Sequence, residues 1–200
     1  MAWVDTIVQG VLLGGVYALN ATGLALIFGV MRLVNLAHGD LIVLAAFLIL
    51  ALTQATGLDP VAALAIVAPI MFLVGYAVQA LVLNRTLGVD ILPPLLVTFG
   101  LSIIVQNGLL EAFSADSRRI HVGALETSSI AVGSAFSIGV MPLLGLIAAM
   151  LVVLALNRLF YATPIGRALR ATSDDADTAQ LVGIDNRRIY ALAMGLAMAV

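Results

Sequence analysis

The sequence predicts an all-α protein, a polytopic bundle of helices that cross a lipid bilayer, and three observations lead to this prediction. The chain of 200 residues is 62% hydrophobic and 10% charged, whereas soluble domains are roughly 45–50% apolar and about 25% charged. Its mean hydropathy is +1.16, and a chain this short leaves roughly a third of its surface in water, so a soluble core cannot hide the surplus. Long uncharged windows also recur, without the alternation of barrel strands.

Composition also excludes several classes of function. The net charge is −2 and all nine basic residues are arginines, so no basic face is expected and nucleic acid is not an expected partner. The chain has no cysteine, which excludes disulfides, thiolate metal sites and cysteine nucleophiles. Its high hydrophobicity excludes intrinsic disorder.

The uncharged windows define the expected spans. A helix needs about 20 apolar residues to cross a hydrocarbon core of roughly 30 Å. We therefore expect a single transmembrane domain over 1–200, with spans near 7–30, 41–57, 61–83, 92–112 and 138–157 and an incomplete sixth span over 189–200.

The two ends of the chain carry further expectations. The first window has no basic residue before Arg32 and is too long for a signal peptide, so we expect it to be retained. The last window stops partway through a span, where a helix end would expose carbonyls to lipid. We therefore expect that the chain is a fragment of a longer protein or that something else covers this end.

Arginines set the expected orientation, because cytoplasmic loops carry an excess of positive charge. With segment 158–188 in the cytoplasm, seven arginines lie inside, and two lie in the predicted outer loop, 113–137. The N-terminus is then outside. The inside set is Arg32, Arg85, Arg158, Arg167, Arg170, Arg187 and Arg188, and the outside set is Arg118 and Arg119.

Small and polar residues inside the spans have two interpretations. Gly10 and Gly14 form a small-xxx-small pair, which favours close packing of a neighbouring helix. Amides in apolar spans must be paired or face a wet cavity, so they either line a translocation path or form interhelical hydrogen bonds. These amides are Asn20, Gln79, Gln106 and Asn107.

The segment Met31–Asp40 interrupts two apolar windows. The spacing of Asn35 and His38 would put both on one helical face, Gly39 would allow a backbone break, and Asp40 would cap the next helix. Either this is a re-entrant turn beside the substrate route, or it is a capped turn at the interface, which physical reasoning alone slightly favours. The candidates for the path are Asn20, Asn35, His38, Gly39, Gln106 and Asn107.

The segment 158–188 predicts two short capped helices. Thr163 followed by Pro164 is a helix-start signal. Thr172 or Ser173 would cap a second helix that has acidic residues in its first turn and ends at Gly183. Its apolar side would comprise Ala176, Ala179, Leu181 and Val182. Such a helix suits docking into a groove on a soluble partner, or it is an interfacial connector.

Two blocks of sequence resemble a known family. The stretch 177–183 (DTAQLVG) looks like the E-A-A-x-x-x-G loop of ABC importer permeases, with Asp for Glu and Thr for the first Ala. The flanking 163–171 (TPIGRALRA) and 183–185 (GID), and the N-terminal 14–19 (GGVYAL) and 27–40 (IFGVMRLVNLAHGD), resemble the branched-chain amino acid ABC importer permease family. The I-x-L-P that continues the general loop pattern is absent after Gly183.

The resemblance implies a role, partners and site residues. The chain would be a non-enzymatic inner-membrane subunit, working with a second permease, cytoplasmic ATPases and a periplasmic or lipid-anchored binding protein, in contact with membrane lipid. It would bind no cofactor itself, because it lacks a phosphate-binding G-x-x-x-x-G-K-[ST] motif and the partner would use the ATP. The helix near 174–182 would couple to the ATPase. The implied coupling residues are Gly166, Arg167, Arg170, Asp174, Asp177, Ala179 and Gly183.

Two other classes stay open from the residues alone. An ion-coupled secondary transporter would need a carboxylate within the membrane, and Asp40 and Glu111 lie at the edges of their windows. An intramembrane hydrolase would need a pair such as Ser102 and His38. The sequence does not name the solute, and branched-chain amino acids, urea, short amides and aromatic acids all suit an uncharged interior.

Overall fold

The computed structural model describes residues 2–88, 92–116, 118–120, 122, 128–132 and 136–200. Five of the helices in these ranges are long and apolar enough to cross a membrane, which confirms the all-α helical class with five candidate spans. They are α1 (Ala2–Met31), α2 (His38–Thr56), α3 (Pro60–Ala77), α4 (Leu92–Phe113) and α5 (Val140–Ala162). Helix α3 continues through a π-helical turn, η1 (Val78–Val82), and a 3-10 turn, η2 (Leu83–Arg85).

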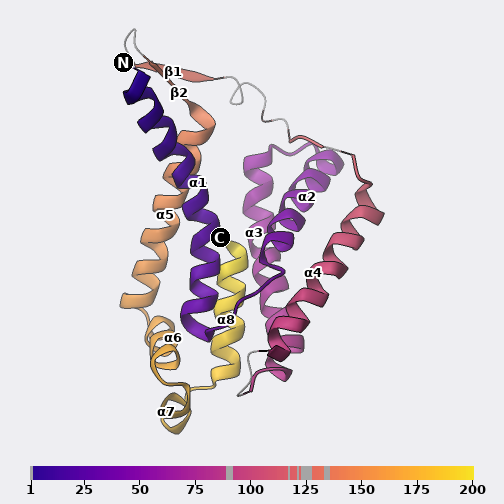
Figure 1. Cartoon of the computed structure of the whole chain (residues 1–200), viewed down its shortest axis with the longest axis vertical. Helices are drawn as coiled ribbons and strands as arrows, with labels where there is room; N and C mark the ends of the chain where they lie inside the picture. The colour runs from indigo at the N-terminus through magenta and orange to yellow at the C-terminus, as the bar shows by residue number, and fades with distance from the viewer. Residues whose placement is uncertain (1, 89–91, 117, 121, 123–127, 133–135) are drawn as a thin grey trace.

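Three shorter helices follow, α6 (Pro164–Asp174), α7 (Ala176–Leu181) and α8 (Asn186–Ala199). Figure 1 shows α6 and α7 at one end of the bundle, opposite the chain's N-terminus, with α8 running back toward the middle. Helix α5 extends past the expected end of its span at 157 and carries Arg158 in its last turns. The connecting segment therefore begins at Thr163.

Local sequence explains the tight connection between α2 and α3. Helix α2 ends at Gly57, whose φ of +70° is the left-handed conformation that glycine adopts without strain. Helix α3 begins at Pro60, and the Asp59 carboxylate accepts a hydrogen bond from the Val61 amide at 2.8 Å. Because the cap and the fixed φ of proline coincide, the chain reverses within a few residues.

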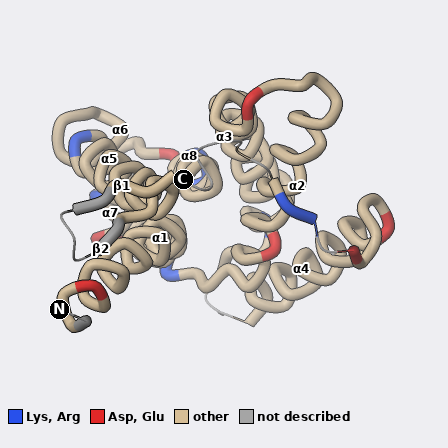
Figure 2. The backbone as a smooth tube through the Cα atoms, turned by 90° about the horizontal axis from the view of Figure 1, so that it is seen from above, with Lys and Arg blue, Asp and Glu red and all other residues tan. Residues whose placement is uncertain are grey.

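The core lies around α8. Helix α8 packs on α3 and α1, and α1 packs on α5, so α8 occupies the middle of the bundle (Figure 1). Fully buried side chains from four helices meet there, including Ile27, Leu41, Met71 and Met194. Viewed from above, the long helices are almost free of charge, and charged residues are confined to short stretches of the backbone (Figure 2).

Glycines set the closest helix contacts, at positions other than the predicted pair. A Cβ at Gly15 would lie 2.8 Å from the Leu146 Cα of α5, and one at Gly75 would lie 2.7 Å from the Met194 carbonyl of α8. A Cβ at Gly10 or Gly14 would have nothing within 4 Å among the described residues. The expected packing role of Gly10 and Gly14 is therefore not seen within this chain, and Gly15 makes the close contact of α1 with α5 instead.

A two-stranded hairpin precedes α5, and the sequence did not predict it. Strands β1 (Ser129–Val132) and β2 (Phe136–Gly139) are antiparallel, with Ile130 opposite Ile138. The region was expected to be a loop, because two four-residue strands are too short to show a clear alternation of polar and apolar residues. The strands precede Val140, so α5 begins later than the expected 138. The rest of the predicted outer loop falls partly outside the described residues.

Candidate functional site

The segment that joins α1 to α2 turns back into the bundle. Helix α1 ends at Met31, and Arg32 has a positive φ of 51°, which reverses the chain. The His38 Nε2 atom then lies 3.4 Å from the carbonyl oxygen of Asn20, and a Cβ at Gly23 would touch the same ring. Since a helix rises 1.5 Å per residue, α2 starts about 12–17 Å back along α1 from its end, as Figure 1 also shows.

The returning segment is irregular, with a turn at Leu36 and Ala37, and burial alternates along it. Leu33, Asn35 and Ala37 are buried, whereas the residues between them are exposed. Side chains satisfy its backbone: the Ala37 amide donates to Asn35 Oδ1 at 3.0 Å, and the Leu36 amide donates to Thr98 Oγ1 of α4 at 3.3 Å. Irregular backbone at this depth needs such partners. The segment thus folds back along α1 before α2 begins, which favours the re-entrant interpretation over a capped turn at the interface.

Two details of that segment differ from the prediction. Asn35 lies in the irregular segment before α2, so it does not share a helical face with His38. Asp40 does not cap α2, since the helix already begins at His38. The Asp40 carboxylate instead accepts hydrogen bonds from Ser102 Oγ and from Gln106 Nε2 of α4. Because α2 begins at His38, Asp40 lies inside its first turn, where its side chain reaches a neighbouring helix.

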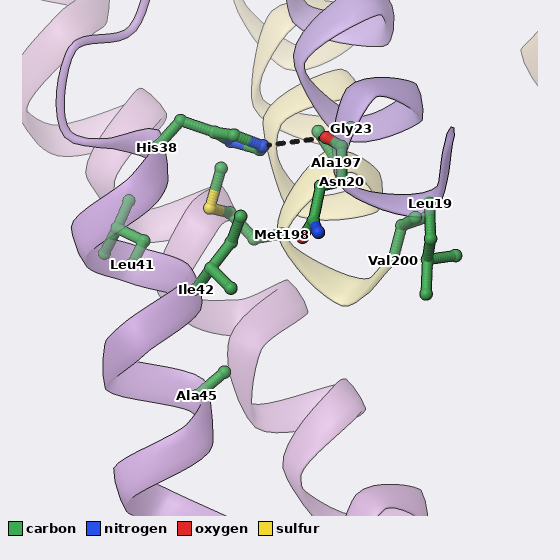
Figure 3. Close-up of a pocket in the computed structure, with 10 residues that line it drawn as sticks. All are labelled: Leu19, Asn20, Gly23, His38, Leu41, Ile42, Ala45, Ala197, Met198 and Val200. Carbon is green, nitrogen blue, oxygen red and sulfur yellow. Dashed lines mark hydrogen bonds between the residues drawn. The ribbon is translucent and has the colours of Figure 1, made fainter. Parts of the chain in front are cut away.

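A small cavity lies where α1, α2 and α8 meet. It has a volume of about 100 Å³, and aliphatic side chains such as Leu41 and Ile42 line it together with the polar Asn20 and His38. In Figure 3 the imidazole points at the Asn20 carbonyl across this space. The other ring nitrogen, Nδ1, is buried with no hydrogen-bond partner among the described residues.

The remaining path candidates form two groups, one at the start of α2 and one whose side chains bond within their own helices. In the first group, Gln106 donates a hydrogen bond to the Asp40 carboxylate, and Gly39 is exposed beside Asp40. The side-chain amides of Asn20 and Asn107 donate within their own helices, to Val16 and Ile103 carbonyls at 3.1 and 2.8 Å.

Gln79 supports the packing interpretation of the buried amides. It is fully buried and donates to Asn84 Oδ1 at 3.0 Å. Asn84 in turn donates to the Arg187 carbonyl at the start of α8, at 3.1 Å. These two hydrogen bonds connect the C-terminal end of the α3 region to the start of α8.

Two capped helices form the connecting segment, as predicted, but the second cap is a different residue. Thr163 Oγ1 accepts from the Gly166 amide at 3.0 Å, with Pro164 after it, which confirms the first cap. Asp175 caps α7, since its carboxylate accepts from the Asp177 and Thr178 amides. The hydrogen bond from the Thr178 hydroxyl, aided by these amides, lowers the pKa of Asp175. Gly183 ends the helix with a φ of +89°.

Thr172 and Ser173 tie the segment to the bundle. Thr172 Oγ1 donates to Asn186 Oδ1 at 3.2 Å, and Asn186 Nδ2 donates to the Ala176 carbonyl at 2.6 Å. Ser173 Oγ donates to the Gly29 carbonyl of α1 at 2.5 Å. Movement of α7 is thereby linked to both α1 and α8.

The predicted coupling residues divide by exposure. Arg167, Asp174, Asp177 and Gly183 are exposed, whereas Gly166 and Ala179 are buried. Arg170 is half-buried, with its guanidinium 4.8 Å from the Tyr161 ring centroid. The expected apolar side of α7 is not one face. Ala179 points inward, while Leu181 and Val182 are 87% and 73% exposed, because Leu181 is the last helical residue and Val182 lies beyond it.

Thr98 was missed from the sequence, and Ser102 was considered only for a hydrolase. Thr98, Ser102 and Gln106 recur every fourth residue, so they form one polar stripe on α4 that meets the returning segment. That spacing could have identified Thr98 and Ser102. The structure does not support the hydrolase interpretation, which requires a hydrogen bond between Ser102 and His38. Ser102 donates to Asp40 instead, and the His38 ring faces α1. Within the described residues, no group of His, Asp and Glu could hold a metal ion.

Comparison with known families identifies the chain's relatives. The family described as "Branched-chain amino acid transport system / permease component" matches residues 6–200. The chain belongs to this permease family. No solved structure matches it significantly.

Three curated relatives are similar over almost the whole of this permease chain. It is 28% identical over 99% of its length to the high-affinity branched-chain amino acid transport system permease protein BraD of Pseudomonas aeruginosa, of which it covers 68%. It is 31% and 29% identical to the corresponding LivH proteins of Salmonella typhimurium and Escherichia coli K12, and covers 66% of each. The chain thus spans about two thirds of these relatives' length. These matches and the five candidate spans show that the chain is a multi-pass membrane protein and a transport permease component.

Proposed function

We propose that this permease is the membrane-spanning subunit of an ATP-driven importer that moves branched-chain amino acids, or a related small amide or acid, across the inner membrane. Family membership and the names of the relatives support the transport role. A second permease subunit would complete the pathway, and a binding protein outside would deliver the solute. ATP would be hydrolysed by a separate cytoplasmic subunit, so the permease itself is not an enzyme.

The observation that carries the proposal is the protruding α7. Leu181 and Val182 are large apolar side chains exposed beyond the spans, next to the acidic Asp174 and Asp177. Exposed apolar residues rimmed by charge mark a protein contact, and a short helix offered in this way fits a groove on a soluble partner. We assign that partner as the ATPase.

The bonds around α7 supply a route for coupling. A push on α7 would reach α8 through Asn186 and α1 through Ser173. A ligand shifts a conformational equilibrium only by its differential contact with the two states. The ATPase would therefore need to hold α7 differently when closed on ATP, and the two buried side chains Thr172 and Asn186 would keep the segment rigid enough to transmit the difference.

Arginine positions support an orientation with the N-terminus outside. Arg32 follows α1, Arg85 ends η2, and four others, Arg167, Arg170, Arg187 and Arg188, lie in α6 or in the first turn of α8. Figure 1 shows the C-terminal ends of α1 and α3, together with α6 and the start of α8, at the α7 end of the bundle. Arg118 and Arg119 follow α4 at the opposite end. The excess of arginine favours the cytoplasm for the α7 end.

Co-purification tests the contact with the ATPase. The double variant Asp177→Arg and Gly183→Trp changes a charge and the left-handed turn on the exposed tip, so recovery of the ATPase with the permease should fall at least about tenfold. The matched control is Leu58→Asp, an exposed leucine at the other end of the bundle, which should leave recovery unchanged. Undiminished association and uptake in the double variant would count against the proposal.

One observation favours a second candidate, an ion-coupled secondary transporter. Its required intramembrane carboxylate is available in Asp40, because α2 starts within the bundle. The two candidates differ in their energy source. Uptake by purified subunits in proteoliposomes should require ATP and ignore a proton or sodium gradient. Uptake that follows either gradient without ATP would contradict the importer proposal and support an ion-coupled secondary transporter.

A further inference from the structure

We propose that Asp40, held between Ser102 and Gln106, is the binding site for the ammonium group of the transported solute. The inference rests on the proposed function and narrows it. The solute would carry a primary ammonium group, as an amino acid does, whereas urea, a neutral amide or a simple acid would not. Three properties of the site lead to this assignment: it lies deep within the spans, Asp40 has no cationic partner among the described residues, and a solute can reach it.

The site lies deep within the spans. Ser102 is at the middle of α4, which runs Leu92–Phe113, and its hydroxyl donates to the Asp40 carboxylate. Asp40 follows His38, whose ring contacts α1 at Asn20, far from either end of that helix. A carboxylate at this depth is costly unless a cation or water meets it, and such residues therefore mark ion or solute pathways.

Asp40 has no positive partner in the described ranges. The ion pair found there joins Arg188 to Asp185, outside the spans. Asp40 accepts from two donors, Ser102 Oγ and Gln106 Nε2. Since an ionised carboxylate has about four acceptor positions, two stay free for further donors, and an ammonium group brings three.

The site is also accessible. Asp40 is half-buried, and Gln106 and Gly39 are exposed, whereas Ser102 is buried behind them. A half-buried carboxylate and an exposed amide at mid-depth do not suit contact with lipid chains, so this face of α2 and α4 borders water or another protein. A translocation path between two permease subunits is such a place.

Charge gives the site its selectivity. A carboxylate attracts an ammonium group through short, charge-assisted hydrogen bonds, and it repels a solute that is only an anion. A neutral amide would gain a weaker hydrogen bond. Asp40 therefore selects for a solute that carries a cationic group.

Transport by Asp40→Asn tests the charge separately from the packing. Asparagine keeps the size and an oxygen that accepts from Ser102, and Gln106 can turn its own amide oxygen toward the new Nδ2 donor, so the contact of α2 with α4 is retained. With the assembled transporter in proteoliposomes, uptake at low solute concentration should fall about 10- to 100-fold, the range for losing a hydrogen bond to a charged group. Stimulation of ATP hydrolysis by the binding protein should persist. Asp40→Glu should recover part of the uptake, and the control Asp59→Asn, an exposed helix cap, should retain all of it.

Direct binding provides a readout that does not depend on transport. The probe is isobutylammonium, which has a branched chain and an ammonium group, compared with neutral isobutanol. Only isobutylammonium should raise the melting temperature of the purified full-length permease, and Asp40→Asn should abolish the shift. Equal shifts in the two proteins, or unchanged uptake by Asp40→Asn, would overturn the inference.

The outcomes distinguish this inference from the proposed function. If the unaltered complex shows no ATP-driven uptake, the importer proposal fails, while the melting shift with isobutylammonium still decides the role of Asp40. If Asp40→Asn instead removes dependence on a sodium or proton gradient, Asp40 binds that ion and the ammonium assignment is overturned.

Discussion

Thr172, near the end of α6, donates a hydrogen bond to Asn186, the first residue of α8, across 3.2 Å between Oγ1 and Oδ1. Both side chains are buried. Asn186 also donates to the Ala176 carbonyl at the start of α7, so a single amide holds three helices together. This contact makes α6, α7 and the base of α8 one rigid unit.

Asn186→Ala should separate that unit. Removal of the amide leaves the buried Thr172 hydroxyl and the Ala176 carbonyl without their partner, which costs about 1–3 kcal/mol. The measurement is thermal unfolding of the purified protein together with uptake in the assembled transporter, and both should decrease. Asn107→Ala is the control, because that exposed amide bonds only within α4. Equal stability of the two variants would show that the contact does not stabilise the segment.

Gly15→Ala should destabilise the α1–α5 contact, whereas Gly14→Ala should not. The added methyl at Gly15 meets the Leu146 backbone, and overpacking of this kind costs about 1–3 kcal/mol. At Gly14 the same methyl meets open space, and alanine gains about 0.5–1 kcal/mol of helix preference. Melting curves in one detergent would compare the neighbouring variants, and a reversed order would contradict the packing described.

Asp175→Ala should loosen α7, and Asp175→Asn should largely preserve it, since both acid and amide caps accept from helix amides. Hydrogen–deuterium exchange over 176–182 measures the difference. The lowered pKa of Asp175 gives the pH dependence its sign. The carboxylate's contribution is present above about pH 4, the pKa of an unfolded Asp, and is lost as the pH falls through the lowered folded value. Equal exchange in both variants would argue against the cap.

Local patterns predicted the spans and the first cap. Hydrophobicity and length determine a membrane helix almost alone, so the five spans were found from charge-free windows. Thr163 followed by Pro164 acts within one turn, and its cap was found for the same reason.

Contacts between distant segments were not predictable in the same way. Whether Asp40 caps its own helix or reaches α4 depends on how far the segment after Arg32 turns back, which is set by packing against Thr98 and Asn20. The second cap is Asp175 rather than Thr172 or Ser173, because Thr172 bonds to Asn186 and Ser173 bonds to Gly29 of α1. Tertiary partners decided both positions.

The most direct test of the account uses a single cysteine, since the natural chain has none. Leu181→Cys places a thiol on the exposed tip of α7. A membrane-impermeant maleimide should label it in inverted vesicles stripped of the ATPase and leave it unlabelled in intact cells, and adding the ATPase back should protect it. Labelling in intact cells, or equal labelling with and without the ATPase, would contradict the claim that α7 is the cytoplasmic contact of an importer.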